Sequence, residues 1–291
     1  MSASQRGTIL LEDAAVLMHQ HLDGEQHVLR LQAPRCAHRA VPGSFVHLRC
    51  AAELPMRRPL SIMRADREGG WIELLYKVTG TGTRALARAG VGERLSVLGP
   101  IGVGFQPDPC RPRALAIGGG VGIPPMVFLA ERLCADPAWK PLVLMGSEIP
   151  FPFRVRPSSI LVPGMPDEAI GCMPLLDGWG VPSRLATRAG YPGCFDGFVT
   201  ELARVWLRSR SAEQLSETAL FACGPTPMLV ATARLAREFA LPCQAALEEF
   251  MACGVGGCAG CAVAVTTARG PAMKRVCVDG PVFDALSVFP P

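Results

Sequence analysis

The sequence predicts an antiparallel β-barrel followed by a parallel α/β domain and a small cysteine-rich module at the C-terminal end. Short, partly alternating apolar segments separated by Gly and Pro turns fill the first part of the chain, which is typical of a small barrel. Buried strands then alternate with helices, which indicates a parallel sheet. The last segment is rich in Gly and Cys and too small for a core of its own. We therefore place the barrel at residues 1–108, the α/β domain at 109–242 and the module at 243–291.

The individual elements follow from apolar segments that end at turn residues. In the barrel, strands are predicted at Val28–Leu31, Phe45–Arg49, Trp71–Lys77 and Arg94–Leu98. In the α/β domain, uncharged apolar runs predict buried strands at Ala114–Ile117, Leu142–Met145 and Ala219–Ala222. Helices are predicted at Pro124–Cys134, Gly197–Arg208 and Thr226–Phe239. The Pro-rich segment 150–166 interrupts this alternation, and no element is predicted for it.

Composition and charge exclude several classes of protein. Hydrophobic residues make up 49% of the 291 residues and charged residues 19%, which supplies a core and argues against long disorder. The net charge of +4 comes without a basic run, so no nucleic acid partner is expected. Met1–Asp13 lacks the pattern of a secretory signal, and glycines and prolines interrupt the apolar stretch Ala114–Ala130. We therefore expect a cytoplasmic chain with no membrane span.

Histidine and serine patterns give no support to hydrolase chemistry. All five histidines lie in the first 47 residues, and no Ser/His/Asp arrangement lies near a glycine loop. His19 and His21 are predicted to share a solvated strand face, for which a metal site is the less favoured alternative. The eight cysteines other than Cys253, Cys258, Cys261 and Cys277 are expected to be reduced and mostly buried.

Four cysteines in the C-terminal module give the strongest signal of the sequence. Cys253-x4-Cys258-x2-Cys261, followed by Cys277 after fifteen further residues, matches the plant-type arrangement of [2Fe–2S] ligands. Glycines between the ligands permit a loop that turns its N–H groups toward sulfur. Structural zinc prefers two paired knuckles, and only one close pair is present here. Zinc and unliganded thiols stay as the alternatives to the cluster.

An arginine and a glycine–threonine loop in the barrel suit a pyrophosphate group. Arg58 begins the run Arg58-Pro59-Leu60-Ser61, and the loop from Lys77 to Thr83 leads into a helix-like segment, Arg84–Ala89. A guanidinium on one side and main-chain N–H groups at a helix start on the other are a common way to bind phosphate. From these residues alone an ordinary turn is an equal alternative.

A second glycine loop lies between a buried strand and a helix. Gly120-x-Gly122-x-x-Pro125 lacks the third glycine of the strict dinucleotide fingerprint, but Pro suits the first turn of a helix whose N–H groups face a ligand. A glycine-rich turn without ligand is the alternative. Cys223-Gly224-Pro225 follows the strand Ala219–Ala222 and by itself predicts only a buried thiol and a turn.

These motifs resemble those of the ferredoxin–NADP⁺ reductase superfamily. Arg58–Ser61 is similar to its Arg-x-Tyr-Ser flavin motif, with Leu60 in place of the tyrosine, as in the branch that has Arg-Pro-(Ile/Leu)-Ser. The other two loops are similar to its Gly-x-Gly-x-x-Pro and Cys-Gly-Pro motifs. The resemblance implies FAD-binding residues at Arg58, Pro59, Leu60, Ser61, Leu75, Tyr76, Lys77, Gly82 and Thr83. It implies nicotinamide nucleotide-binding residues at Gly120, Gly122, Pro125, Cys223, Gly224 and Pro225, with Cys223 against the nicotinamide as the catalytic candidate.

The order of the motifs resembles, over almost the whole chain, the electron-transfer subunit family of type B dihydroorotate dehydrogenase. The runs Glu248–Gly254 and Val276–Phe283 are especially similar to that family. The resemblance implies FAD, a [2Fe–2S] cluster held by the four cysteines, and NAD(H). It also implies a hetero-oligomer with an FMN-containing subunit that oxidises dihydroorotate in pyrimidine biosynthesis, with electrons passing from FMN through the cluster and FAD to NAD⁺.

Two other functions remain open at this point. A related NAD(P)H-dependent reductase subunit could serve another acceptor or dehydrogenase, and a redox- or iron-sensing binding protein could use the cluster alone. The choice between NAD and NADP is also open, because Arg154 and Arg156 follow the second buried strand and an arginine there would suit a 2′-phosphate. The direction of electron flow is not predicted.

Overall fold

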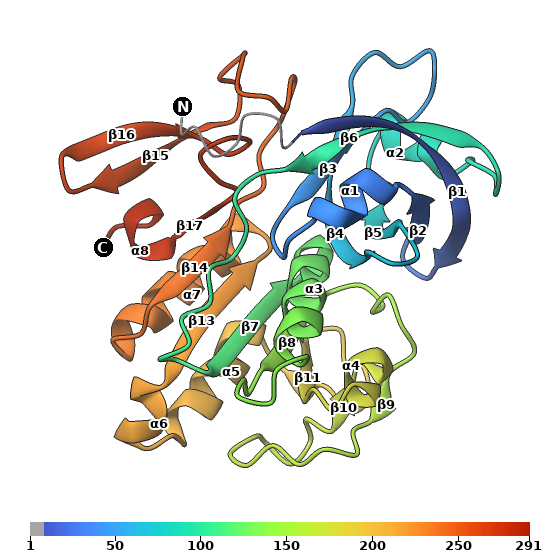
Figure 1. Ribbon diagram of the computed structural model, residues 1–291. Coiled ribbons are helices and arrows are strands. Elements are labelled where there is room, and N and C mark those ends of the chain that lie inside the picture. The colour runs from blue at the N-terminus through green and yellow to red at the C-terminus, as the bar shows by residue number, and fades with distance from the viewer. Residues whose placement is uncertain (1–8) are drawn as a thin grey trace. The chain divides into compact units, whose positions relative to one another are not determined.

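The structure is a computed structural model that describes residues 9–291 and divides into two compact units (Figure 1). The first unit comprises the described chain through Gly104 together with Leu247–Val282. The second comprises Phe105–Ala246 and Phe283–Pro291. The four cysteines predicted to bind the cluster therefore belong to the same unit as the barrel. A division into three domains by cofactor stays a prediction.

The first unit contains a closed antiparallel barrel with the strand order β1-β2-β5-β4-β3-β6. The strands are β1 Leu10–Leu22, β2 Gln26–Gln32, β3 Phe45–Leu48, β4 Arg58–Asp66, β5 Trp71–Lys77 and β6 Arg94–Ile101. Two short helices accompany them, α1 Pro34–Arg39 and α2 Thr81–Leu86. The predicted antiparallel barrel is confirmed.

Alternation along neighbouring strands forms the core of the barrel. On β2, Leu29 and Leu31 are fully buried, and they lie opposite Leu74 and Ile72 of β5, which are fully buried as well. Such apolar cross-strand pairs are the stabilising unit of an antiparallel sheet. Each fully buried Leu or Ile contributes roughly 1.5–3 kcal/mol of transfer free energy.

The cysteine-rich segment adds a hairpin to the barrel unit. Its strands β15 Ala262–Thr267 and β16 Gly270–Arg275 pair antiparallel. The end of the segment returns to the barrel, where Val103 N donates to Gly280 O at 2.6 Å and Val103 bridges to Pro281. A Cβ on Gly102 would collide with the ring of Pro281, so glycine is required at this contact.

The second unit is built on a seven-stranded sheet with the order β12-β11-β8-β7-β13-β14-β17. The strands are β7 Arg113–Gly119, β8 Leu142–Gly146, β11 Ser183–Thr187, β12 Phe195–Asp196, β13 Thr218–Cys223, β14 Cys243–Ala246 and β17 Val282–Asp284. Pairing from β12 through to β14 is parallel. The predicted parallel α/β sheet is confirmed.

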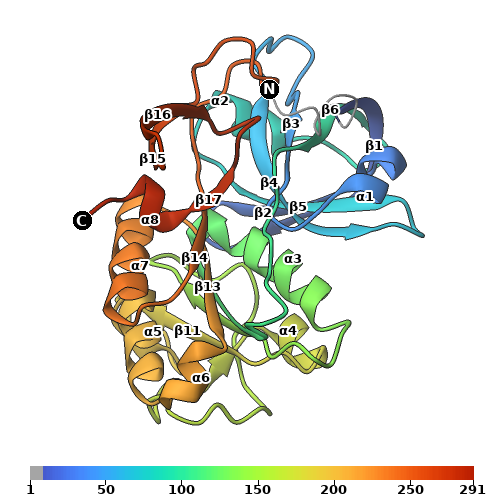
Figure 2. The ribbon, with the colours of Figure 1, turned by 60° about the vertical axis from the view of Figure 1, so that its left-hand side comes forward.

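Helices cover both faces of this sheet. The helices are α3 Ile123–Leu133, α4 Pro174–Gly178, α5 Val199–Arg208, α6 Ala212–Ser216, α7 Thr226–Glu238 and α8 Ala285–Val288. Figure 2 shows α3 on one face and α5 with α7 on the other, which is the arrangement of doubly wound sheets. Over residues 9–291, no helix is long and apolar enough to cross a membrane.

The Pro-rich segment between β8 and β11 is ordered by side-chain hydrogen bonds and contains a short strand pair, β9 Arg156–Pro157 and β10 Gly171–Cys172. The Asp177 carboxylate accepts from Ser158 Oγ at 2.7 Å and from Ser159 Oγ at 2.8 Å. The buried Arg184 of β11 donates to Ile160 O at 2.7 Å. The strand β11 was not predicted because Ser183 and Arg184 interrupt its apolar run, although both are buried.

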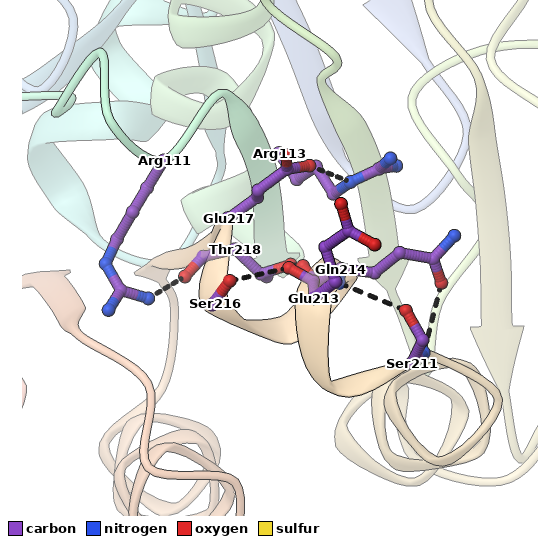
Figure 3. Close-up of polar contacts among 8 residues, drawn as sticks. All are labelled: Arg111, Arg113, Ser211, Glu213, Gln214, Ser216, Glu217 and Thr218. Atoms are coloured by element: carbon purple, nitrogen blue, oxygen red, sulfur yellow. Dashed lines mark hydrogen bonds and ion pairs between the residues drawn. The ribbon is translucent and has the colours of Figure 1, made fainter.

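The amino ends of β7 and β13 are joined by a polar network (Figure 3). Arg113 Nε lies 2.9 Å from Glu217 Oε2, and Arg113 N donates to Glu217 O at 3.0 Å. Arg111 Nη1 donates to Thr218 O at 2.9 Å, and Thr218 Oγ1 donates to Gln214 O at 2.7 Å. This network closes the end of the two strands that is opposite their glycine loops, so it is structural.

Candidate functional site

Cys261 and Cys277 are brought together by the hairpin β15–β16. Cys261 immediately precedes β15 and Cys277 follows β16, and Val276 N donates to Cys261 O at 3.0 Å. The two Sγ atoms are 3.4 Å apart and buried. Two thiolates bound to one tetrahedral metal with bonds of about 2.3 Å would be roughly 3.7 Å apart. The two sulfur atoms, which are in hydrogen-bond contact, are therefore within about 0.3 Å of the spacing expected for two ligands of one metal ion.

Cys253 and Cys258 form a second pair in the glycine loop before β15. Val255 N lies 3.5 Å from Cys253 Sγ, and Gly260 N lies 3.4 Å from Cys258 Sγ. Burial raises the pKa of the Cys253 thiol, but N–H groups of Val255, Cys258 and Gly257 together with the Cys258 side chain outweigh it and lower this pKa to about 7. The predicted N–H groups directed at sulfur are present.

The four thiols match the donor set of a [2Fe–2S] cluster. Such a cluster takes four cysteines, two on each iron, and the structure provides the pairs Cys253/Cys258 and Cys261/Cys277. In the part of the chain that the structure describes, no group of three or more His, Cys, Asp or Glu side chains is placed to hold one metal ion.

Arg58 and the glycine–threonine loop, which are separate in sequence, are in contact in the barrel. Arg58 begins β4, and its Nη1 donates to Met56 O at 2.9 Å. A Cβ on Gly82 would lie 2.5 Å from Arg58 Nε, so the guanidinium packs directly on the glycine. Thr83 Oγ1 accepts from Thr79 N at 3.0 Å, which shapes the loop.

The helix after this loop begins earlier than predicted. It spans Thr81–Leu86, whereas the sequence predicted Arg84–Ala89. The reason is the Thr83 hydroxyl, which satisfies the N–H groups of Thr79 and Gly80 and so lets the first turn form within the glycine–threonine loop itself.

The remaining residues predicted for the flavin lie on β4 and β5. Pro59, Leu60 and Ser61 follow Arg58 on β4, are half-buried, and pair with β3. On β5, Leu75 and Tyr76 are buried and Lys77 is half-buried.

The Tyr76 side chain is already engaged within the barrel. Its ring stacks on His27 at 5.1 Å with 11° between the planes, and its hydroxyl lies 2.8 Å from His19 Nε2. His19 Nδ1 donates to Ala89 O at 2.8 Å. His19 is thus hydrogen-bonded and half-buried, whereas His21 is exposed. Of the two histidines predicted to share a solvated strand face, only His21 is therefore solvated. Because its side chain is engaged in this way, Tyr76 would contact a ligand through its main-chain atoms.

The two loops predicted for the nicotinamide nucleotide meet in the second unit. Gly118 of β7 pairs with Cys223 of β13, so both loops leave the carboxyl ends of adjacent parallel strands. A Cβ on Gly122 would collide with the carbonyl group of Cys223, and one on Gly119 would lie 2.6 Å from Met228 Sδ. In open α/β sheets, ligands bind outside the carboxyl ends of the strands.

Each nucleotide loop contains a glycine with a positive φ angle. Gly120 has φ +54 and would leave a Cβ in open space, and Gly224 has φ +153. A 3₁₀ turn at Gly120–Gly122 leads into α3, which has Pro125 in its first turn as predicted. The Cys223 side chain is buried at the end of β13. Arg154 and Arg156 are exposed in the Pro-rich segment.

His47 is a buried polar residue next to the cysteine loop that the sequence analysis did not single out. It lies in β3, is fully buried, and neither ring nitrogen makes a hydrogen bond of regular geometry with the described residues. Burial and then the charge of Arg57 lower its pKa, while the main chain of Met251 and Cys253 acts in the opposite direction. The available signal was a histidine inside the apolar strand Phe45–Leu48, where a polar side chain needs a reason.

Comparison with known proteins identifies relatives over nearly the whole chain. A family model described as the iron–sulfur cluster binding domain of dihydroorotate dehydrogenase B matches residues 248–289. The electron transfer subunit of dihydroorotate dehydrogenase B (NAD(+)) from Shouchella clausii (strain KSM-K16) is 33% identical over 264 residues, which are 89% of this chain and 90% of that relative. The subunit of the same name from Bacillus caldolyticus is 35% identical over 249 residues, 84% and 85% of the two chains.

Solved structures share the fold. A chain of the NADH-dependent reduced ferredoxin-NADP oxidoreductase superposes with a TM-score of 0.76 at 24% identity, covering 95% of this chain and 90% of that chain. The ferredoxin reductase in carbazole 1,9a-dioxygenase superposes with a TM-score of 0.61 at 20% identity, covering 80% and 67%. At these identities the likeness concerns the fold.

The fold and the relatives agree with the interpretation of the sequence. The ferredoxin reductase-like arrangement of barrel and parallel sheet is confirmed, and so is the family that the order of motifs indicated. With an iron–sulfur binding segment at its C-terminal end and relatives of matching length, the chain belongs to the family of electron transfer subunits of dihydroorotate dehydrogenase B.

Proposed function

We propose that this chain holds FAD and a [2Fe–2S] cluster and exchanges electrons between NAD(H) and an FMN-containing partner subunit that oxidises dihydroorotate, as part of a hetero-oligomer in pyrimidine biosynthesis. The observation that carries the proposal is the spacing of 3.4 Å between the Cys261 and Cys277 sulfur atoms in a chain that is 33% identical to electron transfer subunits of that enzyme. NAD(H) is proposed because the relatives carry NAD(+) in their names.

For the cluster, we assign Cys253 and Cys258 to one iron and Cys261 and Cys277 to the other. When bound, FAD can exchange electrons singly or as a hydride, and a [2Fe–2S] cluster carries one electron at a time. The N–H groups near Cys253 and Cys258 stabilise negative charge on sulfur. Buried Cys261 and Cys277 keep water from the other side of the site.

For FAD, Arg58 is the residue proposed to bind the pyrophosphate. The carbonyl groups of Met56 and Arg57 accept from its Nη1 at 2.9 and 3.2 Å and so orient the guanidinium plane. Main-chain groups of Gly82 and Thr83 complete this side of the site, because the glycine allows the guanidinium to approach the loop. Pro59–Ser61 and Leu75–Lys77 are proposed to line the isoalloxazine.

For NAD(H), the two loops at the carboxyl ends of β7 and β13 are proposed to bind together. Gly120 and Gly122 present main-chain N–H groups at the start of α3, which suits a pyrophosphate, and Pro125 holds the first turn of the helix in place. Cys223, Gly224 and Pro225 are proposed to lie beside the nicotinamide, with Cys223 positioning it for hydride transfer. Cys223 is held against Gly122 by the close packing of the two loops.

The test is anaerobic purification of the full chain, with visible spectra, flavin and iron assays, and titration with NADH. Flavin and cluster absorption that NADH bleaches together is the expected result. Co-expression with an FMN-containing dihydroorotate-oxidising subunit should then give a complex in which dihydroorotate reduces both groups. A protein that binds zinc and no flavin, or a flavin that NADH leaves oxidised, would refute the proposal.

A further inference from the structure

The barrel strand β3 carries an unusual buried side chain, His47. The side chain is fully buried, and neither Nδ1 nor Nε2 makes a hydrogen bond of regular geometry with the residues described, although main-chain groups of Met251, Cys253 and Arg57 lie near the ring. Buried polar groups nearly always have a partner, and one without calls for an explanation. A hydrophobic residue would fill the same buried place without this penalty.

The ring of His47 lies against the loop that carries the first cysteine ligand. A Cβ on Gly254 would lie 2.7 Å from His47 Nδ1 and 3.4 Å from Ile101 Cδ1, so the Gly254 backbone packs directly on the imidazole. Gly254 has φ +66, a backbone conformation that favours glycine. The main chain of Met251 and of Cys253, and that of Arg57 before β4, also lies beside the ring. Nδ1 of His47 therefore faces the cluster loop.

The other side of His47 belongs to the strand pair that carries the proposed flavin residues. In the pairing of β3 with β4, His47 lies opposite Pro59 and Leu48 lies opposite Arg58. Pro59 has no N–H to donate, and Arg57 Nη1 instead donates to His47 O at 3.2 Å and to Ser96 O at 2.7 Å. One residue thus connects the flavin strand with the loop of Cys253.

We propose that His47 is a positioning residue for the iron–sulfur cluster. The imidazole of His47 anchors the main chain of Met251–Gly254 to the barrel and thereby fixes Cys253 relative to β4. The inference rests on the proposed function, because it needs the cluster at the four cysteines. Groups that hydrogen-bond around metal ligands orient those ligands and adjust the properties of the metal. The imidazole acts on Cys253 through the loop backbone and not as a ligand.

The test compares three variants of the full chain, purified anaerobically with FAD and cluster. H47L removes both ring nitrogens, H47N keeps an N–H near the position of Nδ1, and H27L is the matched control, since His27 is a buried barrel histidine that contacts Tyr76 and not the cluster loop. The measurements are FAD content, the EPR spectrum and midpoint potential of the reduced cluster, and the rate at which a chelator removes iron.

H47L is expected to keep its FAD, to change the EPR spectrum and the potential, and to lose iron roughly 10-fold faster, as when the outer partner of a metal ligand is removed. H47N is expected to restore most of the wild-type behaviour, and H27L to leave the cluster signals unchanged. A wild-type EPR spectrum, potential and iron-loss rate in H47L would overturn the inference. So would equal effects of H47L and H27L, which would indicate general packing.

Two further outcomes are separable. If the wild-type chain binds no cluster, the proposed function fails, whatever the variants do. If H47L does not fold, H47F decides, because it keeps an aromatic ring at this place and lacks both ring nitrogens. A changed EPR spectrum in H47F with FAD retained supports the anchor, and an unchanged one overturns it.

Discussion

Gly122 packs directly against the carbonyl group of Cys223. A Cβ on Gly122 would collide with this carbonyl and lie 2.5 Å from Gly224 N, so no other residue fits without moving a backbone. The contact joins two loops that are about a hundred residues apart in sequence and gives them one common surface at the carboxyl ends of β7 and β13.

Gly122→Ala is therefore expected to impair NADH binding selectively. The added methyl group must displace one loop from the other, and overpacking of this kind costs about 1–3 kcal/mol of stability. Reduction of the flavin by NADH should slow strongly, while FAD and iron contents stay at wild-type values, because both groups are proposed for the other unit. Gly178→Ala is the control, since its Cβ would meet open space. Equal NADH titrations for both variants would contradict the prediction.

Cys277→Ser is expected to abolish the cluster and leave the flavin. Serine cannot supply the thiolate opposite Cys261, and the chain should lose the EPR signal of the reduced cluster while FAD absorption remains. Cys110→Ser, which changes an exposed cysteine in the other unit, is the matched control. Iron analysis and EPR measure the outcome, and a full cluster signal in Cys277→Ser would show that the assignment is wrong.

Arg58→Ala is expected to weaken FAD binding. One charge-assisted hydrogen bond contributes about 1.5–3 kcal/mol, so the Kd for FAD should rise roughly 10- to 100-fold. Arg67→Ala, in the exposed turn between β4 and β5, is the control for loss of an arginine from the same strand pair. The Kd is measured by fluorescence titration of flavin-depleted protein. Equal Kd values for the two variants would remove Arg58 from the flavin site.

Protonation of His27 is expected to lower the stability of the barrel in mild acid. Burial lowers the pKa of His27, the nearby His19 and His21 on β1 lower it further, and Glu25 acts in the opposite direction; the Tyr76 ring stacks on the remaining face. Because the pKa is lower in the folded than in the unfolded chain, the unfolded chain binds the proton more readily. The stabilisation is thus present above about pH 6.5 and is lost as the pH falls below that value.

Urea unfolding of wild type and of His27→Gln between pH 8 and pH 5 measures this effect. The variant should lose less stability on acidification than the wild type does. His38→Gln, an exposed histidine on α1, should keep the wild-type slope. Parallel pH profiles for wild type and His27→Gln would contradict the prediction.

Strands whose two faces are equally buried could be predicted from the local pattern of apolar residues in the sequence. The strands β7 and β13 are buried on both faces and therefore appear as apolar runs bounded by glycine, and α7 follows Cys223-Gly224-Pro225 as a helix after a turn. The long strand β1 was not predicted, because a bulge between Val16 and Met18 shifts its alternation from one face to the other.

The sequence by itself determined the chemistry and the order of the sites. The spacing of Cys253, Cys258, Cys261 and Cys277 indicates a set of four thiolate ligands, because thiolates at these intervals suit two irons. The tertiary structure alone decided which residues meet: Arg58 with Gly82, Gly122 with Cys223, and His47 with Gly254. Contacts of this kind depend on strand order and register, which are set by the packing of the whole unit and leave no trace in the local pattern of residues.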